Sequence, residues 1–407
     1  MDRVILHCDC NNYFASVELL ERPDLRELPV AVAGDPEGRH GIILAKNQLA
    51  KKYGVKTAET IWQAQRKCPG LILLPPHMEK YKAISQQINA IYLDYTDQVE
   101  AFSIDESWLD VTGSQHLFGD GRVIADTLRR RVREEIGITI SVGVSWNKTF
   151  AKMGSDYKKP DATTVITREN VSELLYPLPV TDLIFVGESV GTALAQHGVR
   201  TIGDLASRSR EELEAWLGKS GEGLWIAAQG LDDSPVKRYG ERDPVKSVGN
   251  GMTYPHDLVG REEFIAGLTP LCESVGARLR AQKLKCATLT LQIKNPQLKV
   301  ISRQKPVEPP TNLTKYLLRE AITLLDSAWS PTAPVRLFTV TAGSLMSEDA
   351  PVAAQLSFLE DAPQEDPRQR QLEKTMDALR GKFGKGAVAT GRGLANKMEK
   401  EKVEGKK

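Results

Sequence analysis

His7-Cys8-Asp9-Cys10-Asn11-Asn12-Tyr13-Phe14 and, further along the chain, Ser103-Ile104-Asp105-Glu106 are the stretches that decide the fold and the chemistry of this protein. Each adjoins apolar residues that predict a buried strand. Together they supply three carboxylates, from Asp9, Asp105 and Glu106, and the Cys10 carbonyl is a further candidate ligand. Carboxylates that converge need cations between them, and Mg²⁺ is the usual ion at an all-oxygen site that binds phosphates. Two such ions about 3.5–4 Å apart would clamp the oxygens of a phosphoryl displacement, so the residues predict nucleotidyl transfer.

Two other interpretations of these segments compete with the magnesium site. Acidic residues at strand ends can be ordinary solvated turn residues, but Asp9 and Asp105 each follow apolar residues, where an unpaired charge is costly. Zinc is the second alternative, because His7, Cys8 and Cys10 are close in sequence. On a strand, however, the two cysteines share one face and His7 the other, and no further Cys pair is spaced to complete a zinc site. The cysteines are therefore predicted to lie in the core.

The composition indicates a multidomain protein in a reducing compartment. At 407 residues the chain is long enough for several domains. Its 54 Lys and Arg balance 53 Asp and Glu, so the overall charge does not indicate nucleic acid. Residues 245–343, in contrast, have more basic than acidic residues. Five cysteines without paired spacing predict the cytoplasm and no disulfide framework. We expect no signal peptide and no membrane span.

The order of predicted elements indicates two α+β parts with short helices between them. Residues 1–165 alternate strands and helices around an antiparallel-rich sheet, and Asn11 or Asn12 is expected to cap a helix that begins near Tyr13. Residues 170–230 predict short helices, and 231–246 a linker. The last part is predicted as a split βαβ sandwich. Its strands are expected at 247–254, 285–294, 298–305 and 334–343, and its helices at 261–281 and 313–328.

Three smaller features suggest contacts with ligands or partners. Lys159, before Pro160 at the end of a predicted helix, is a candidate triphosphate anchor, although a solvated helix end is an equal alternative. Phe14 would lie beside the sugar of a nucleotide bound at the metals and exclude a 2′-hydroxyl; taken alone, it would be an ordinary core residue. The tail peptide Gln355-Leu356-Ser357-Phe358-Leu359 is predicted to dock on a partner, because apolar clusters outside a core usually mark contacts.

Four segments, residues 7–18, 102–110, 141–160 and 246–255, resemble the Y-family, translesion DNA polymerases, and the bacterial members most of all. The likeness extends over residues 1 to about 345. It implies an α+β multidomain, right-hand polymerase fold. The palm would be 1–24 and 80–165, the small fingers 25–79, the helical thumb 166–233, the linker 234–244 and the βαββαβ little finger 245–343. The tail, 344–407, would hold the clamp-binding peptide 355–359 and a short helix, 367–384.

The resemblance also implies the activity and its participants. The chain would be a template-directed DNA polymerase that adds dNTPs to a primer 3′ end with two Mg²⁺ ions, at low fidelity, without proofreading, in damage tolerance. Asp9, Asp105 and Glu106 fall at the metal positions, Phe14 at the sugar-selecting aromatic with Tyr13 beside it, and Lys159 at the triphosphate lysine. Expected DNA contacts are Lys148, Lys152, Gly187, Lys246, Lys294, Lys299, Arg303 and Lys305. The partners would be primer–template DNA and, through residues 355–359, a sliding clamp; we expect a monomer.

Three features depart from the pattern of this family. Asn11 replaces an acid that many members have. Gln48 and Lys51 stand where Tyr and Arg often contact the triphosphate, and Lys51 lacks the bidentate fork of arginine. The thumb turn, usually Gly-hydrophobic-Gly, is Phe185-Val186-Gly187 here, which weakens the expectation of backbone contacts to DNA. Two alternatives remain: a mutasome-type subunit that needs accessory proteins, and a catalytically silent scaffold bound to the clamp.

Overall fold

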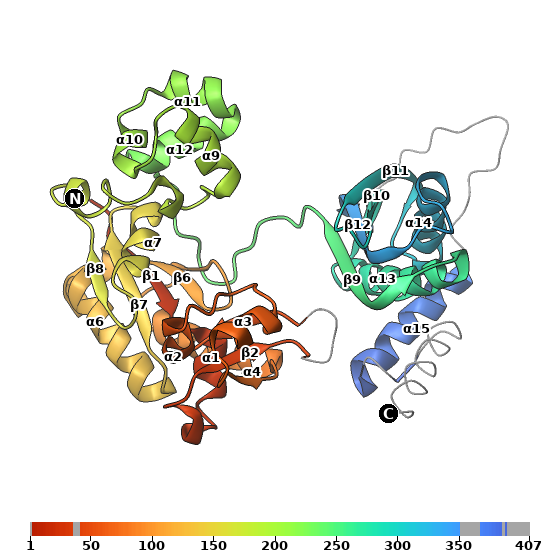
Figure 1. Cartoon of the computed structure of the whole chain (residues 1–407), viewed down its shortest axis with the longest axis horizontal. Coiled ribbons are helices and arrows are strands. Elements are labelled where there is room, and N and C mark those ends of the chain that lie inside the picture. The colour runs from red at the N-terminus through yellow and green to blue at the C-terminus, as the bar shows by residue number, and fades with distance from the viewer. Residues whose placement is uncertain (1, 36–40, 351–366, 385–386, 389–407) are drawn as a thin grey trace. The chain divides into compact units, whose positions relative to one another are not determined.

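The computed structural model describes residues 2–35, 41–350, 367–384 and 387–388, which form two compact units, Met1–Arg242 and Asp243–Lys407 (Figure 1). The clamp-binding peptide predicted at 355–359 lies outside the described residues. None of the described helices combines the length and the apolarity that a bilayer crossing requires.

The centre of the first unit is a five-stranded sheet in the order β5-β6-β1-β7-β8. Its strands are β1 (Ile5–Cys10), β5 (Val99–Ala101), β6 (Glu106–Asp110), β7 (Ile140–Ser145) and β8 (Thr163–Val165). Every residue of β1 is buried, with Leu6, Cys8 and Cys10 in one core cluster and Ile5 in another. The predicted division of this strand into two faces, with the cysteines in the core, is therefore confirmed.

Helices cover both faces of this sheet. The Cys8 face packs against α1 (Tyr13–Glu18), α4 (Met78–Leu93) and α6 (Gly121–Arg131), while α7 (Lys148–Tyr157) lies on the Asp9 face. Gly143 on β7 permits this close approach, because an added Cβ would lie 1.9 Å from the Ala151 carbonyl oxygen on α7. The remaining short elements of this part are η1 (Pro23–Leu25), η2 (Thr112–Ser114), α5 (Gln115–Phe118) and the π-helical turn η3 (Val132–Ile136).

Residues between α1 and α4 form a small separate layer. Its sheet, in the order β3-β2-β4, consists of β2 (Val30–Ala33), β3 (Ile43–Lys46) and β4 (Ile72–Leu74). Its α-helices within the described residues are α2 (Gln48–Lys52) and α3 (Ile61–Lys67). Asn47 caps α2 by accepting a hydrogen bond from the Ala50 amide, and Thr60 and Gln63 form a capping box on α3. Both helices are short, so this layer has no long helix within the described residues.

Short helices follow β8 and enclose a core of their own. They are α8 (Val171–Leu174), η4 (Val180–Asp182), α9 (Glu188–Gln196), α10 (Ile202–Ala206), α11 (Arg210–Leu217) and α12 (Lys219–Ala228). Phe150 and Met153 of α7 belong to this core, and the side chains of Trp146 and Asn147 both donate to the Gly230 carbonyl at 2.9 Å. The helix α7 is therefore shared between the five-stranded sheet and the helical region.

The segment predicted as a polar linker is fixed to the first unit over its first half. Val236 is buried against Ile5 and Trp108, the Lys148 ammonium reaches the Pro235 carbonyl, and the Tyr239 amide donates to the Asp97 carbonyl. The unit boundary at Arg242 and Asp243 lies near the end of this segment. Only the residues after about 239 are left to connect the two units.

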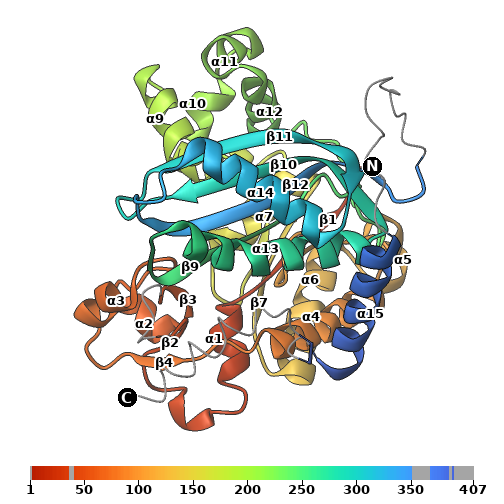
Figure 2. The same ribbon diagram turned by 90° about the vertical axis from the view of Figure 1, so that its right-hand side faces the viewer.

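The second unit is a four-stranded antiparallel sheet in the order β11-β10-β12-β9, with two helices on one face (Figure 2). The strands are β9 (Val248–Leu258), β10 (Leu284–Lys294), β11 (Val300–Thr311) and β12 (Val335–Ser347), and the helices are α13 (Arg261–Ala281) and α14 (Thr314–Ala328). The observed order, βαββαβ, is the predicted one. The strands β9 and β11 run further than predicted, through Pro255 and Pro306, because both are edge strands, where proline is tolerated.

A further helix, α15 (Pro367–Phe383), attaches to this unit by its polar face. Glu373, only 4% exposed, accepts hydrogen bonds from the Thr314 amide (2.9 Å) and hydroxyl (2.8 Å) and pairs with Arg280. The helix α14 has no side-chain cap of its own, so Glu373 supplies the negative charge at its N-terminus. Asp377 pairs with Arg280, and Arg380 with Glu273. The apolar residues at helical spacing, Leu372, Leu379 and Phe383, are exposed instead.

We expect Glu373→Ala to lower the free energy of unfolding of the second unit by about 2 kcal/mol, because it removes the acceptor of the Thr314 amide and hydroxyl and one of the two carboxylates that pair with the buried Arg280 guanidinium. Calorimetry of the full chain measures this change. The control is Lys374→Ala, at an exposed neighbouring position. Equal stabilities of the two variants would contradict the capping role.

Candidate active site

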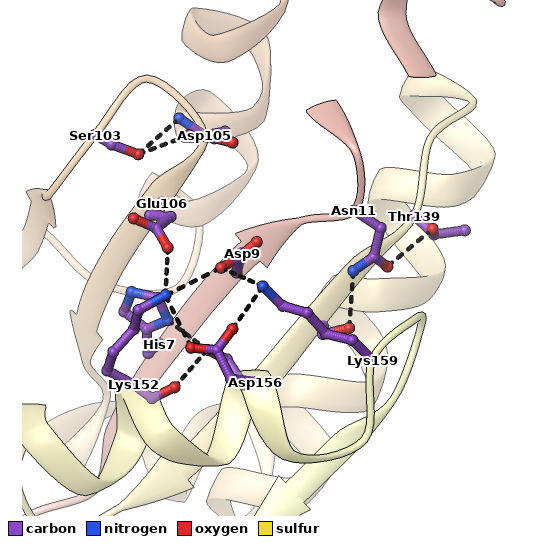
Figure 3. A network of polar contacts seen from close by, with 12 residues as sticks. His7, Asp9, Asn11, Ser103, Asp105, Glu106, Thr139, Lys152, Asp156 and Lys159 are labelled. Atoms are coloured by element: carbon purple, nitrogen blue, oxygen red, sulfur yellow. Dashed lines mark hydrogen bonds and ion pairs between the residues drawn. The ribbon is translucent and has the colours of Figure 1, made fainter. Parts of the chain in front are cut away.

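Asp9 and Glu106 lie directly opposite each other on the neighbouring antiparallel strands β1 and β6. Residues paired in this way project from the same face of the sheet, and here that face is covered by α7. Asp9 is 6% exposed and Glu106 is half-buried. The fold therefore brings two of the three predicted acids together in a largely buried position (Figure 3).

Three residues of α7 and the loop after it surround this pair with charge. The Lys152 ammonium contacts Glu106 and lies 3.2 Å from carboxylate oxygens of both Asp9 and Asp156. The Lys159 ammonium lies 2.6 Å from Asp9 and 2.7 Å from Asp156. Lys152 and Asp156 are four residues apart on one helical face. Figure 3 shows the resulting network of alternating acids and ammonium groups.

The pKa values of Asp9 and Glu106 show that the two neighbouring carboxyl groups influence each other's ionisation. Burial, together with a hydrogen bond to Asp9, raises the pKa of Glu106 to about 7. Burial also acts to raise the pKa of Asp9, but the hydrogen bond from Glu106 and the charges of Lys159 and Lys152 outweigh it and lower this pKa. Burial opposes the charged form of Lys152, yet the surrounding carboxylates raise its pKa above the usual value. The paired acids thus depend on positive charge placed between them.

Asp105 does not face the other two acids. It lies in the bend just before β6, where its carboxylate accepts a hydrogen bond from the Ser103 hydroxyl at 2.7 Å, as Figure 3 shows. Its backbone is nevertheless joined to the end of β1, because the Cys10 amide donates to the Asp105 carbonyl at 3.0 Å. Within the described residues, no three acidic, histidine or cysteine side chains are arranged as a metal site. Of the three carboxylates expected to converge, the structure therefore brings together those of Asp9 and Glu106.

The aromatic residues after β1 have different environments. Phe14 is half-buried and stacks on Tyr81, with ring centroids 4.3 Å apart and an interplanar angle of 12°. Tyr13 is buried, and its hydroxyl donates to the Tyr81 carbonyl, so its side chain has a structural role. The prediction that an asparagine side chain caps α1 is wrong, because Asn12 has a left-handed backbone (φ 51°) and makes no side-chain cap bond.

Asn11 joins the segments around the site, a role that sequence reasoning missed. Its amide nitrogen donates to the Ser141 hydroxyl at 2.9 Å, and its oxygen accepts from the Thr139 hydroxyl and the Asp161 amide. A neutral amide can donate and accept at once, whereas a carboxylate could not donate to Ser141. Asn11 therefore fixes the chain just after Lys159.

His7, beside Asp9 in sequence, is fully buried against Trp108 and bonded to the Ser155 hydroxyl at 2.8 Å. Burial and the charge of Lys152 hold its pKa well below the usual value. His7 is thus a neutral core residue.

The predicted nucleotide and DNA contacts are only partly brought to this site. Lys148 pairs with Glu100 at 2.7 Å and is largely buried, and its role as a DNA contact stays a prediction. Lys152 faces the acids rather than a surface. Gln48 and Lys51 lie on α2, and the neighbouring Lys46, which we had not predicted, has a pKa lowered by burial and by the charge of Lys51.

The predicted contacts in the thumb and the second unit have varied exposure. Gly187 is exposed just before α9. In the second unit, Lys246, Lys299 and Arg303 are exposed, Lys294 is half-buried, and Lys305 pairs with Glu320.

Comparison with known proteins identifies the family of this chain. Residues 8–156 match the impB/mucB/samB family, and residues 245–358 match the C-terminal domain of that family. DNA polymerase IV of Acetivibrio thermocellus is 45% identical over 96% of this chain and 97% of that protein. The chain belongs to the Y-family of DNA polymerases. DNA polymerase IV 1 of Bacillus subtilis is 35% identical over 99% of this chain and 95% of its own length. A solved Y-family chimera of Dbh and Dpo4 matches with a TM-score of 0.73 and 25% identity, over 84% of this chain and 99% of the chimera.

Membership of the Y-family confirms the predicted fold class and activity. The chain is a DNA-directed DNA polymerase of the translesion type, with primer–template DNA and dNTPs as substrates. Divalent metal ions are a general requirement of the family. The Asp9–Glu106 pair lies within the part of the chain that matches the first family model.

Proposed function

We propose that this polymerase adds nucleotides at the Asp9–Glu106 pair, with Asp105 and the Cys10 carbonyl completing a site for two Mg²⁺ ions. The donors fit this ion, because they are hard oxygens at the end of a buried strand. When bound, the ions would neutralise charge at the attacking and leaving oxygens of the transferred phosphate. The observation that carries the proposal is the register pair of the buried Asp9 and the half-buried Glu106, because neighbouring carboxylates removed from water are costly without positive charge beside them.

The lysines of the site supply the rest of the positive charge. Lys159 lies within hydrogen-bonding distance of both Asp9 and Asp156, so its ammonium is already held at the edge of the acid pair. We assign it to the triphosphate, for which lysine acts as a point charge. Gln48 and Lys51, with Lys46 beside them, are assigned to the outer phosphates. These contacts would orient the α-phosphate toward the primer end.

Phe14 is assigned as the residue that selects deoxyribose. Its ring is held from behind by Tyr81, which is fully buried and bonds to Glu18 through its hydroxyl. A ring supported in this way cannot easily move aside for a 2′-hydroxyl. Within the described residues, the α-helices of the fingers are the short α2 and α3, which suits an open site with low fidelity.

We assign non-specific DNA binding in the second unit to Lys246, Lys294, Lys299 and Arg303. Lys294 and Lys299 lie at the turn between β10 and β11, and Arg303 follows on the edge strand β11. Contacts of this kind to phosphates make affinity depend on salt rather than on sequence. Lys305 is a weaker candidate, because Glu320 already pairs with it.

Primer extension by the purified single chain with Mg²⁺ tests this function. We expect extension of an undamaged template and insertion opposite at least one type of damaged base without any accessory protein. Extension only after addition of other subunits would favour the mutasome alternative. Binding of DNA without extension under any condition would favour the silent scaffold.

We also propose that residues 355–359 dock this enzyme, as a monomer in the cytoplasm, on a sliding clamp. Such a tether raises the effective concentration of the enzyme at primer ends. Replacing Leu356, Phe358 and Leu359 by alanine should therefore reduce the ratio of product made with and without the cognate clamp to about one. Full stimulation of this variant would place the docking peptide elsewhere.

A further inference from the structure

Glu18, the last residue of α1, is a buried acid that the proposed chemistry does not use. It is only 6% exposed, and its carboxylate contacts residues at the start of α4. It accepts a hydrogen bond from the Tyr81 hydroxyl, and its two oxygens lie 3.0 and 3.1 Å from the His77 Nδ1. The Lys80 ammonium lies 4.0 Å away. A buried carboxylate is costly unless donors surround it, so a role for this cluster has to be found.

Tyr81 connects Glu18 to the residue assigned to the sugar of the nucleotide. Phe14 and Glu18 are four residues apart, so they lie on the same face of α1. Tyr81, on α4, meets both of them: its ring stacks on the Phe14 ring, and its hydroxyl donates to Glu18. The Tyr81 side chain is thus held at its face and at its far end by two residues of one helix.

The hydroxyl of Tyr81 specifies one position for a ring that apolar packing alone would fix less well. Tyr81 is fully buried, and a buried hydroxyl needs an acceptor. Glu18 is the acceptor here, and a carboxylate can accept from Tyr81 and from a second donor, such as His77, at the same time. The energy of a stacked pair depends on the lateral offset of its rings. The Glu18 bond therefore sets where the Tyr81 ring supports Phe14.

We propose that Glu18 is a positioning residue for the selection of deoxyribonucleotides, which acts by holding Tyr81 behind Phe14. This inference rests on the proposed function, which assigns the contact with the sugar to Phe14. Glu18 itself touches no substrate in this proposal. Because displacements of about 1 Å alter reaction rates strongly, a Tyr81 ring released from Glu18 would let Phe14 give way to a 2′-hydroxyl. Insertion of ribonucleotides would then rise relative to insertion of deoxyribonucleotides.

Near-isosteric substitutions separate this role from a contribution to stability. Tyr81→Phe keeps the ring and removes only the hydroxyl, so we expect it to lower the selectivity for dNTP over rNTP by roughly fivefold, the factor that one hydrogen bond is typically worth. Glu18→Ala should have a similar effect, whereas Glu18→Gln keeps an acceptor oxygen and should retain most of the selectivity. The control is Glu21→Ala, which removes a 75% exposed carboxylate that pairs with Lys80 at 3.0 Å. Wild-type selectivity of Tyr81→Phe in single-nucleotide insertion would overturn the proposal.

A double-mutant cycle shows whether the effect passes through Phe14. Once Phe14 is replaced by alanine, Tyr81→Phe should change the selectivity no further, because the supported ring is gone. The same fivefold loss in that background would overturn the proposal, since Tyr81 would then act on the sugar by another route. If Phe14→Ala lowers the selectivity and Tyr81→Phe does not, this inference alone fails. If Phe14→Ala leaves the selectivity unchanged, the proposed sugar contact fails with it.

Discussion

Asp105→Ala should lower the rate of primer extension by about 10³-fold, although the Asp105 carboxylate lies apart from the other two acids in this structure. Loss of one metal ligand removes several kcal/mol of transition-state stabilisation, and each 1.4 kcal/mol or so corresponds to a factor of ten in rate. The side chain makes one hydrogen bond, to Ser103, in a bend before β6. Its removal should therefore leave the fold and DNA binding nearly unchanged. Single-turnover extension at saturating DNA measures the effect.

A surface acid of the same unit provides the matched control for this variant. The Asp94 side chain is 59% exposed and pairs with Arg131 at 2.8 Å. Asp94→Ala removes one negative charge away from the acid pair and should extend primers as the wild type does. Normal extension by Asp105→Ala would show that two acids suffice, and the metal assignment of Asp105 would then be withdrawn.

Phe14→Ala should raise incorporation of ribonucleotides relative to deoxyribonucleotides by about 10- to 200-fold, the range for discrimination by a single steric contact. We expect this effect because Tyr81 holds the Phe14 ring in place, so that the ring excludes a 2′-hydroxyl. Single-nucleotide insertion with matched dNTP and rNTP pairs gives the ratio. Tyr13→Phe is the control, because it removes only the hydroxyl that donates to the Tyr81 carbonyl. Unchanged selectivity of Phe14→Ala would mean that another residue excludes the 2′-hydroxyl.

The sequence predicted elements well where the local pattern decided them. The helix α13 has the predicted bounds, Arg261–Ala281, because its apolar periodicity is continuous. The strand β11 was predicted to stop before Pro306 but continues to Thr311. Whether a proline ends a strand depends on whether that strand lies at a sheet edge, and edge position is a property of the whole sheet. The polar docking of α15 through Glu373 is likewise non-local, because Arg280 and Thr314 are far from it in sequence.

The candidate site also combines features that the local sequence predicts with features that depend on the whole fold. Asp9 and Glu106 could be predicted, because each lies in a strand whose neighbours are apolar. The role of Lys152 between them could not, since it depends on how closely α7 approaches the sheet at Gly143. The side-chain direction of Asp105 follows from the bend before β6 and its bond to Ser103. Asn11 differed visibly from the family pattern, but its three partners come from segments more than a hundred residues away.

The number of bound Mn²⁺ ions, counted by electron paramagnetic resonance, tests the assignment of the metal ligands. The sample is the wild-type enzyme with primer–template DNA and a non-hydrolysable dNTP, compared with Asp105→Ala. We expect two bound ions for the wild type and fewer for the variant. Equal numbers of bound ions in both proteins, or none in either, would contradict the assignment of Asp9, Asp105 and Glu106 as the metal-binding residues of this polymerase.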